Sequence, residues 1–528
     1  MKRLHTILIL MLLLNTAHAR LYWVFLVDDP GRPPAVISEK AADRVALRGN
    51  LRIPGSKLVL PDHIAEIEFL GFKIKTASRF LNAVSVDVQS EEDIYTLKQL
   101  PFVIDMQPVG QRPSRKPVAF DSETSLARIT QFEYGDSYTQ NAMLGIPALH
   151  NYGYDGAGVL IGIFDTGFNQ VHPAFDAMDI VKTYDFVDQE VDVTTTYLSN
   201  HGDDVLSVIG GYAPGELIGP AYGASYLLAR TENIGSETRQ EEHNWMAAVE
   251  WADSLGVDII SSSLVYFDFD GTGEDYPISA LDGQTTIVAQ AANIAAARGI
   301  LVVNANGNDG PGDMTLWPPA DSPDVLSVGA VGPDEVITGF SGRGPTYDGR
   351  IKPDVVAQGS SVQMVSGTSG YKLGQGTSYS TPAVAGLAAL LLQAAPDISP
   401  DSIISIFKAN GDRASNPDNI YGYGIPQFAY LFEPIGGDQF LNNLTFPNPS
   451  TYDFIHLVLP HRIPGDVDDA KLYNIRGQYL GELAVEKVSG TTLRLNLPDD
   501  TLLADQLLIA SVRIDDKRYT GKFVYIKS

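Results

Sequence analysis

The stretch GQGTSYSTPAVAGLAALLLQ (residues 374–393) places Ser378 directly ahead of a run of alanine, glycine and leucine. Small side chains such as Ala385 and Gly386 let a helix pack closely between layers, so the run predicts a buried helix. A serine at a helix start is usually an N-cap, because its hydroxyl accepts a backbone N–H. The same helix end carries free N–H groups and a positive dipole, which would stabilise negative charge developing at a nucleophilic Ser378.

Around this stretch, the chain alternates apolar runs with amphipathic segments. The runs are continuous rather than alternating, which indicates strands buried on both faces and hence a parallel sheet. They cover residues 158–167, 224–232, 257–264, 299–308 and 325–331. Helices are predicted between them, at 241–256 and 285–299, so the fold class of this block is α/β.

The N-terminus reads MKRLHTILILMLLLNTAHAR, with two basic residues ahead of an apolar stretch at 7–14 and small residues at Ala17 and Ala19. This pattern predicts a secretory signal peptide over residues 1–19. Its apolar core is too short to span a bilayer, and no later segment is long enough, so no permanent membrane span is expected. The chain is therefore expected to be exported.

Three further domains follow from changes in composition. Residues 20–115 combine strands at 23–29 and 81–89 with a capped helix at 90–100, which predicts a small α+β unit. The basic, proline-containing RPSRKP nearby suits an exposed, cleavable linker. Residues 117–434 form the α/β block. Residues 435–528 hold short strands separated by turns, which predicts an all-β sandwich.

Composition excludes several function classes. The 528 residues carry 64 acidic and 37 basic side chains, a net charge of -27. So acidic a chain does not suit binding to a phosphate backbone, and no nucleic-acid partner is expected. It contains no cysteine, which excludes disulfides, thiolate catalysis and cysteine-ligated metals.

A nucleophilic serine needs a base, and the base needs an orienting carboxylate. His201 opens the apolar helical segment of SNHGDDVLSVIGG, whereas His172 precedes proline in a loop and is expected to be structural. Asp165 ends the strand VLIGIFD, at the sheet edge where active sites of open parallel sheets collect. A second Gly-Thr-Ser is followed by no helical run, so its Ser369 has no expected catalytic role.

The middle block resembles the subtilisin-like serine proteases, the subtilase family of peptidase S8 type. The similar segments are GIFDTG, NHGDDV, GTSYSTP and FSGRGPTYDGRIKPDVVAQG, in the family's chain order. The resemblance implies a parallel sheet flanked by helices and a secreted endopeptidase that works through an acyl-enzyme. It implies a triad of Asp165, His201 and Ser378, with Asn308 as the side-chain oxyanion donor. The substrate-binding residues implied in the cleft are Ser263, Leu264, Val265, Ala305, Asn306 and Gly307.

The sequence departs from the family pattern around the base and the cleft. His201 is followed by Gly202-Asp203-Asp204, and two acids near the imidazole should raise its pKa. Val265 stands where the family commonly has glycine, which narrows the cleft and leaves the cleavage preference open. No metal ligand is assigned. The loop after His201 is shorter than the calcium loop of many relatives, so no cofactor is assigned. Whether the chain binds calcium is left open by the sequence.

The flanking blocks resemble known accessory domains. Residues 20–115 resemble the family's inhibitory propeptide, the alternative being a permanent accessory domain. Residues 435–528 resemble the C-terminal sorting domain of type IX secretion in Gram-negative bacteria, through FPNPS, LYNIRGQYL and the closing GKFVYIKS. The alternatives are a substrate-binding sandwich or structural padding. The implied partners are protein or peptide substrates, the chain's own propeptide and the type IX machinery, at the cell surface or outside the cell.

Two other functions are alternatives to a protease. A catalytically silent surface-binding protein could use the same scaffold, but it would have no need of Asp165, His201, Asn308 and Ser378 together. An esterase of the α/β-hydrolase type would need a Gly-x-Ser-x-Gly elbow and the order Ser, Asp, His. The chain has no such elbow around a candidate serine, and its order is Asp, His, Ser.

Overall fold

The computed structural model describes most of the chain. The described residues are 20–49, 55–109, 132–195, 201–233, 235, 237–270, 275–427, 441–442, 444–446, 454–458, 467–474, 479–487, 492–497, 506–514 and 517–525. The predicted signal peptide, the basic linker and the boundary at 434/435 lie outside these residues. So do parts of the three C-terminal motifs.

In the described part of the chain, the central sheet has seven strands, all parallel, in the order β13-β12-β11-β10-β5-β9-β6. Their bounds are β5 Leu160–Asp165, β6 Asp179–Asp185, β9 Ser225–Arg230, β10 Ile259–Ser262, β11 Leu301–Ala305, β12 Val325–Val331 and β13 Val355–Gln358. Each predicted apolar run contains one of them, which confirms the α/β class and the parallel sheet. The edge strands β6 and β13 were not predicted.

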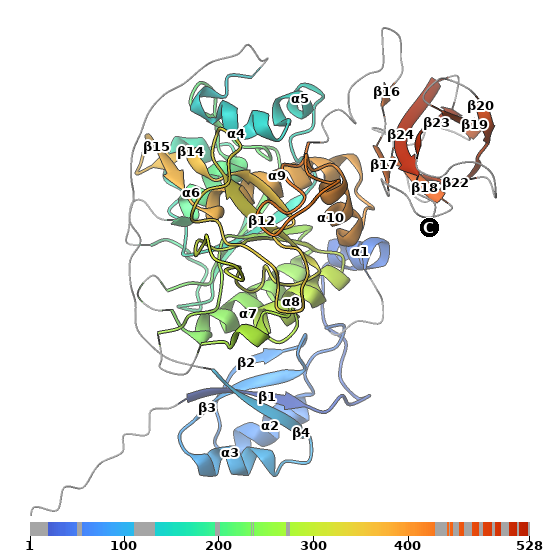
Figure 1. Cartoon of the computed structure of the whole chain (residues 1–528). Coiled ribbons are helices and arrows are strands. Elements are labelled where there is room, and N and C mark those ends of the chain that lie inside the picture. The colour runs from blue at the N-terminus through green and yellow to red at the C-terminus, as the bar shows by residue number, and fades with distance from the viewer. Residues whose placement is uncertain are drawn as a thin grey trace, which may run out of the picture. The chain divides into compact units, whose positions relative to one another are not determined.

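Helices cover both faces of this sheet (Figure 1). Helices α6 (His201–Gly210) and α9 (Thr377–Ala394) pack on one face, and α7 (Arg239–Leu255) and α8 (Ile287–Ala297) on the other. Shorter helices are α4 (Tyr138–Met143), α5 (Ile146–Asn151) and α10 (Pro400–Ala409). The buried helix predicted from residues 374–393 is α9, whose apolar side chains belong to the same core as strands β5 and β10 to β13.

Small antiparallel ribbons complete the block. Strands β14 (Ser360–Ser366) and β15 (Gly370–Gln375) form a hairpin immediately before α9, and β7 (Tyr212–Ala213) pairs with β8 (Leu217–Ile218). The second Gly-Thr-Ser is the turn of the hairpin, where Gly367 has φ +60°. Ser369 is therefore a turn residue, as the missing helical run indicated.

The N-terminal region contains a four-stranded antiparallel sheet in the order β2-β3-β1-β4. Its elements are β1 Arg20–Leu26, α2 Pro61–Phe69, β2 Ile74–Ser78, β3 Ala83–Val88, α3 Glu91–Lys98 and β4 Val103–Val109. The predicted capped helix is α3, which Ser90 and Asp93 close with a capping box. This compact unit takes in residues 20–35 and 55–109 of the described chain. Helix α1 (Glu39–Arg48), which was not predicted, groups with the α/β block instead.

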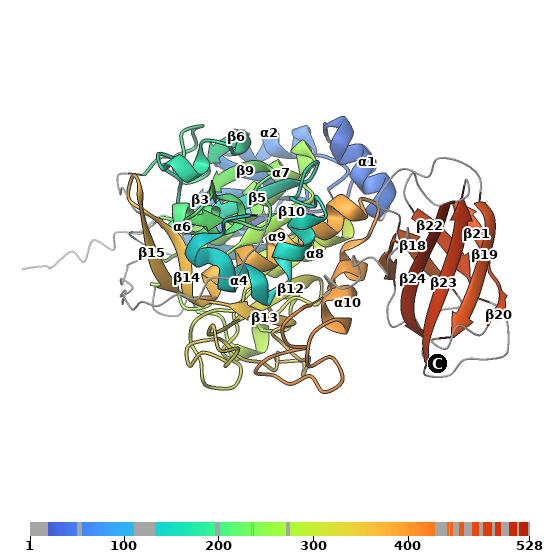
Figure 2. The ribbon, with the colours of Figure 1, turned by 90° about the horizontal axis from the view of Figure 1, so that it is seen from above.

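The described C-terminal strands form two sheets, which Figure 2 shows, and these sheets share one hydrophobic core. One sheet has the order β16-β24-β23-β19-β20 and the other β17-β18-β22-β21. The strands are β16 Leu441–Asn442, β17 Leu444–Phe446, β18 Phe454–Val458, β19 Val467–Asn474, β20 Tyr479–Glu482, β21 Ala484–Lys487, β22 Thr492–Asn496, β23 Gln506–Ile514 and β24 Lys517–Tyr525. Side chains such as Leu457 and Leu495 from one sheet meet Leu472 and Leu508 from the other, as a β-sandwich requires.

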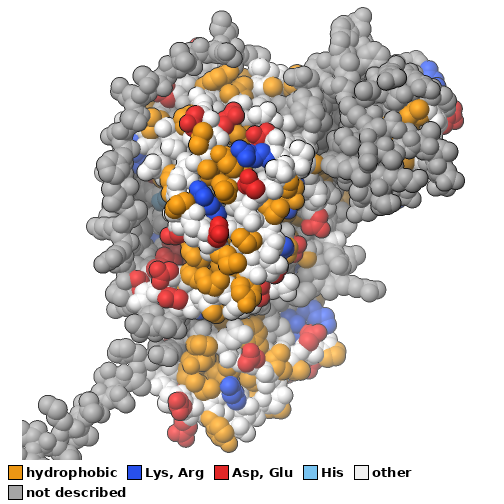
Figure 3. Space-filling view, viewed as in Figure 1, with side chains coloured by type: hydrophobic (Ala, Val, Ile, Leu, Met, Phe, Trp, Pro, Cys, Tyr) orange, Lys and Arg blue, Asp and Glu red, His pale blue; other side chains and the backbone are white. Residues whose placement is uncertain are grey.

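The described surface shows mixed chemistry. Over the described part of the face in Figure 3, acidic, basic and apolar side chains are interspersed. None of the described helices is both long and apolar enough to cross a membrane.

Gly386 tests how closely α9 packs. A Cβ at this position would lie 2.3 Å from Cγ of Pro220, so Gly386→Ala should lower the free energy of unfolding by about 1–3 kcal/mol through overpacking. Thermal or denaturant unfolding of the purified protein measures the change. Gly339→Ala is the matched control, because nothing lies within 4 Å of its added Cβ. Equal stability of the two variants would contradict the close packing.

Candidate active site

Asp165 and His201 meet at the C-terminal edge of the sheet. Asp165 is the last residue of β5 and is fully buried. Its Oδ1 and Oδ2 lie 2.8 and 3.0 Å from Nδ1 of His201, the first residue of α6. A proton on Nδ1 is held by this carboxylate, which leaves Nε2 as the nitrogen that can accept another proton.

The close approach of α6 to the end of β5 depends on the residue after the histidine. A Cβ on Gly202 would lie only 2.1 Å from the carbonyl oxygen of Gly167. Any larger residue would push the start of α6, and His201 with it, away from Asp165. The glycine of the NHGDDV motif therefore has a packing role in this contact.

Ser378 is the second residue of α9 and is 8% exposed. The N-cap of α9 is Gly376, which has no side-chain cap, so Ser378 is not the cap that its sequence position suggested. Ser263 ties this helix start to the end of β10, because its Oγ donates to the Ser378 carbonyl at 2.8 Å. Two first-turn N–H groups of α9 have partners, because Thr377 donates to Asn308 Oδ1 and Tyr379 to the Gly376 carbonyl.

The structure brings the three predicted catalytic residues to one region without closing every contact. The ring of Tyr379, the neighbour of Ser378, lies 5.8 Å from the ring of His201. The Ser378 hydroxyl contacts the carbonyl oxygen of Ser263 at 3.5 Å, and no hydrogen bond joins Ser378 to His201. Asp165 and His201 are therefore paired, and the Ser378 hydroxyl must turn toward the imidazole to join them.

Asn308 lies just beyond β11, on the same edge of the sheet. Its Oδ1 accepts the backbone N–H of Thr377 at 2.9 Å and the Thr377 hydroxyl at 3.0 Å. A backbone N–H can only donate, so the amide oxygen has to face Thr377. The Asn308 Nδ2 group is thereby turned away from the Thr377 N–H and hydroxyl.

The charge on His201 is set by several neighbours. Burial is the largest single influence and lowers the pKa of His201, but the Asp165 and Asp204 carboxylates together outweigh it, so the pKa is raised above the usual 6.5. Lys372, 2.8 Å from Asp204, opposes the rise. The sequence predicted this direction but assigned it to both acids. Asp203 instead accepts the backbone N–H groups of Asn169 and Gln170 and is not among the principal charges acting on His201.

The predicted substrate-binding residues differ in accessibility. Leu264 and Val265 follow β10 and are half-buried, and Asn304 Nδ2 links this segment to β11 through the carbonyl oxygens of Leu264 and Ala305. Ser263, Ala305, Asn306 and Gly307 are buried. The Asn306 side chain donates to the Gly342 carbonyl at 2.6 Å, so its amide faces the protein interior rather than a cleft.

Sequence reasoning missed an aromatic pair beside these residues. The rings of Phe267 and Trp317 are stacked with centroids 4.0 Å apart, and Trp317 Nε1 donates to Asp309. A Cβ on Gly307 would lie 2.9 Å from Trp317, so the indole covers this glycine directly. Because Phe267 and Trp317 belong to separate loops and to no motif, only their meeting in space reveals the pair.

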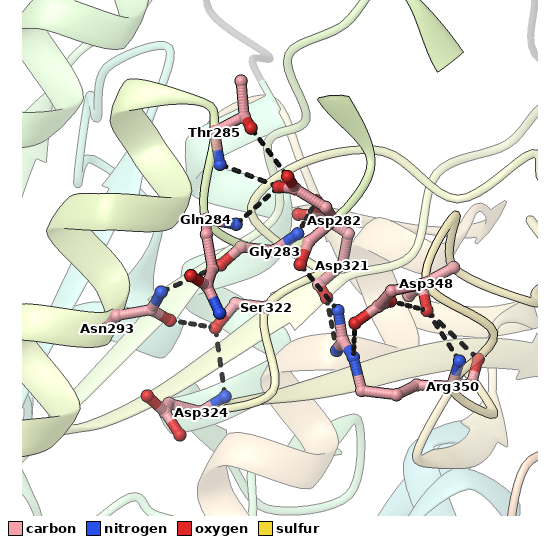
Figure 4. A network of polar contacts seen from close by, with 11 residues as sticks. Asp282, Gly283, Gln284, Thr285, Asn293, Asp321, Ser322, Asp324, Asp348 and Arg350 are labelled. Carbon is pink, nitrogen blue, oxygen red and sulfur yellow. Dashed lines mark hydrogen bonds and ion pairs between the residues drawn. The ribbon is translucent and has the colours of Figure 1, made fainter. Parts of the chain in front are cut away.

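The loop that follows Trp317 is held by a polar network (Figure 4). Arg350 donates from Nη1 to the Asp321 carbonyl, from Nη2 to the Asp282 carbonyl, and from Nε to the Asp348 carboxylate. The Asp321 carboxylate accepts the Gly283 N–H at 2.7 Å. One guanidinium thus joins the loops that contain Asp282, Asp321 and Asp348.

Two groups of carboxylates in the described residues have spacing that could hold a metal ion: Asp185 with Asp188 and Glu190, and Glu232 with Glu237 and Glu241. Arg230 binds Asp185 and Asp188 of the first group and supplies positive charge there. In the second group, burial and repulsion from Glu232 raise the pKa of Glu237 and Glu241. Protons can therefore relieve the charge of this group.

Comparison with known proteins identifies the α/β block. A model of the Subtilase family (Peptidase_S8) matches residues 156–424, about half of the chain. The chain belongs to the subtilase family. The family membership that the GIFDTG, NHGDDV and GTSYSTP segments predicted is thereby confirmed.

Individual relatives of this subtilase are about 30% identical. Serine protease AprX of Bacillus subtilis is 32% identical over 51% of this chain and 65% of its own length. Subtilisin E of the same species is 30% identical over 62% of this chain and 80% of its own. Subtilisin-like protease SBT6.1 of Arabidopsis thaliana is 32% identical over 54% of this chain but only 26% of its own. The chain thus covers less than two thirds of AprX and of the Arabidopsis protein.

The pH dependence of this subtilase should follow His201. The base must be neutral to accept a proton, so activity falls as the pH drops through the pKa of His201, and a raised pKa places this acid limb at higher pH. Asp204→Asn removes a charge that raises this pKa and leaves Lys372 in place. The acid limb of kcat/KM against pH should therefore move to lower pH.

Asp203→Asn is the matched control for this measurement. An asparagine oxygen can accept the same backbone N–H groups, so its acid limb should stay where it is in the unsubstituted protein. An Asp204→Asn profile that stays in place or moves to higher pH would contradict the assignment of the shift to Asp204.

Proposed function

We propose that this subtilase is an exported serine endopeptidase that hydrolyses peptide bonds through an acyl-enzyme on Ser378. The pairing of the buried Asp165 carboxylate with Nδ1 of His201 is the observation that supports this most directly. A carboxylate in that position fixes the tautomer that makes Nε2 a base. Ser378 at the start of α9 and Asn308 beside it supply the nucleophile and an oxyanion donor.

In the proposed reaction, the Ser378 hydroxyl turns from Ser263 toward His201. Nε2 takes the hydroxyl proton while Oγ attacks the peptide carbonyl, and Asp165 stabilises the imidazolium. The negative carbonyl oxygen is met by Asn308 Nδ2 and the Ser378 N–H. The imidazolium then gives its proton to the leaving amine. Water, activated by the same base, hydrolyses the ester and returns Ser378.

The flanking regions enter the same proposal as processing and export elements. Residues 1–19 direct secretion, the unit of residues 20–115 acts as an inhibitory propeptide, and residues 435–528 direct type IX secretion. The support for the propeptide is a compact antiparallel α+β unit with its own hydrophobic core. The support for the sorting domain is a β-sandwich with its own core.

Labelling with a serine-directed fluorophosphonate separates a protease from a silent surface-binding protein. The purified secreted form should be labelled, and Ser378→Ala should abolish the label because the activated hydroxyl is lost. Ser369→Ala, in the turn of the β14–β15 hairpin, is the matched control and should keep the label. An unlabelled but folded and processed protein would favour the silent binder.

The contribution of Asn308 can be measured by steady-state kinetics. Asn308→Ala should lower kcat by about 10²–10³-fold with little change in KM, since the donor acts on the transition state; the magnitude is one measured on a subtilisin itself. Asp309→Asn is the matched control, because an asparagine can still accept the Trp317 N–H. A normal kcat in Asn308→Ala would remove Asn308 from the oxyanion site.

A further inference from the structure

Helix α1 interrupts the N-terminal unit in sequence but contacts the protease domain. The antiparallel unit comprises described residues 20–35 and 55–109, whereas residues 36–49 group with the α/β block. Ser38 caps α1 through Ala41, and its backbone N–H donates to the Ser254 carbonyl of α7 at 2.9 Å. The helix is thus bound to a part of the chain that lies some two hundred residues away.

The central residue of this contact is Arg44, whose side chain is 1% exposed. Its Nη1 donates to the Val257 carbonyl at 2.7 Å and its Nε to the Arg298 carbonyl at 3.1 Å. Nη2 donates to the carboxylate and the carbonyl of Asp253. Burial lowers the pKa of Arg44, with Asp253 opposing, to about 10, so the guanidinium stays charged at neutral pH.

The acceptors of Arg44 belong to two helix ends. Asp253 lies in the last turn of α7, Val257 just beyond it, and Arg298 is the C-cap of α8. The last carbonyls of a helix lack partners inside the helix and carry the negative end of its dipole. A guanidinium placed between two such ends satisfies the carbonyls and both dipoles at once. Arg298 also binds Asp253, at 2.8 Å, and completes a buried ion network.

The protease domain leaves room for α1 at two glycines. Gly256 ends α7 with φ +90°, and Gly299 follows α8 with φ +84°. A Cβ on Gly256 would lie 2.8 Å from Lys40, and one on Gly299 would lie 2.9 Å from Arg48. The same glycines that end the two helices therefore let the backbone of α1 approach.

The rim of the contact is also charged. Lys40 and Arg48 of α1 both bind the carboxylate of Asp258, which precedes β10 and accepts the Leu160 N–H. This is the N-terminal edge of the sheet, since Leu160 begins β5 and Asp165 ends it. The contact therefore lies one strand length, about 16 Å, from the triad edge.

We propose that the C-terminal ends of α7 and α8, with Asp258, form a docking site for the basic helix α1, and that α1 anchors the N-terminal region to the protease domain after the chain is cut beyond residue 109. The anchor acts at the sheet edge opposite the candidate active site, so it holds the region whether or not the cleft is occupied. Cutting alone then does not free the N-terminal fragment. That such a cut occurs during maturation rests on the proposed function, whereas the docking does not.

The experiment uses the full chain with two changes. Ser378→Ala prevents self-cleavage, and a recognition sequence for an unrelated site-specific protease is placed between residues 110 and 131. After cutting and dilution, gel filtration at successive times measures how much N-terminal fragment remains bound. The fragment should stay with the protease domain, and Arg44→Ala should release it roughly a hundredfold faster, as expected for a buried charged contact. Asp43→Ala, on the exposed side of α1, should release it at the unsubstituted rate.

Two results would overturn the anchor: loss of the unsubstituted fragment within the dead time of the column, or equal release from Arg44→Ala and Asp43→Ala. Thermal unfolding before the cut shows whether each variant is folded. If Arg44→Ala is not, the double variant Lys40→Ala with Arg48→Ala removes the rim contacts with Asp258 instead, and release no faster than in Asp43→Ala would likewise overturn the anchor. The fluorophosphonate label is irrelevant to this inactive chain, so failure of the proposed protease function would leave the outcome unchanged.

Discussion

Parallel pairing of β5 with β9 and β10, and of β10 with β11, brings the C-terminal ends of separate segments to one sheet edge. Asp165 ends β5, Ser263 follows β10 and Asn308 lies beyond β11. Asp165 is thereby placed by a backbone hydrogen-bond ladder, whereas Ser263 and Asn308 follow the last paired residues of β10 and β11. His201 and Ser378 are then added by two helices, α6 and α9, that begin at this edge. The contact between Asp165 and His201 depends on this register.

Close packing sets how precisely the two helices meet the sheet. Gly202 lets α6 approach the Gly167 carbonyl, and Gly386 lets α9 approach Pro220. Both act by allowing a backbone to come nearer than any side chain would permit. The electrostatics of the base depend on the same approach, since Asp204 in the first turn of α6 and Lys372 of β15 act on His201 in opposite directions.

The opposite, N-terminal edge of the sheet carries a buried ionic contact. There the ends of α7 and α8 present carbonyl groups and Asp253, and Arg44 of α1 meets them in a buried site. The chain as a whole carries a net charge of -27, yet three basic residues of one short helix meet this single acidic edge. The candidate chemistry therefore lies at one edge of the sheet, and the charged contact of α1 at the other.

Local sequence patterns determined most of the fold. Continuous apolar runs predicted β5 and β9 to β12, and the Ala-Gly-Leu run predicted α9. An element that is buried on both faces needs apolar or small side chains at consecutive positions, and the sequence shows these directly. The motifs around Asp165, His201, Ser378 and Asn308 determined the family and the candidate site. The edge strands β6 and β13 were not predicted, since the half-exposed β6 lacks a continuous apolar run. Strand β13 lies within FSGRGPTYDGRIKPDVVAQG, a segment interpreted as a family motif and not as a strand. Tertiary structure alone decided that Asp204 rather than Asp203 acts on the imidazole, that Ser378 is not a cap, and that Arg44 joins residues two hundred positions away. These outcomes depend on which groups face each other across the packed interior, and neighbours in space leave no periodic signal in the sequence.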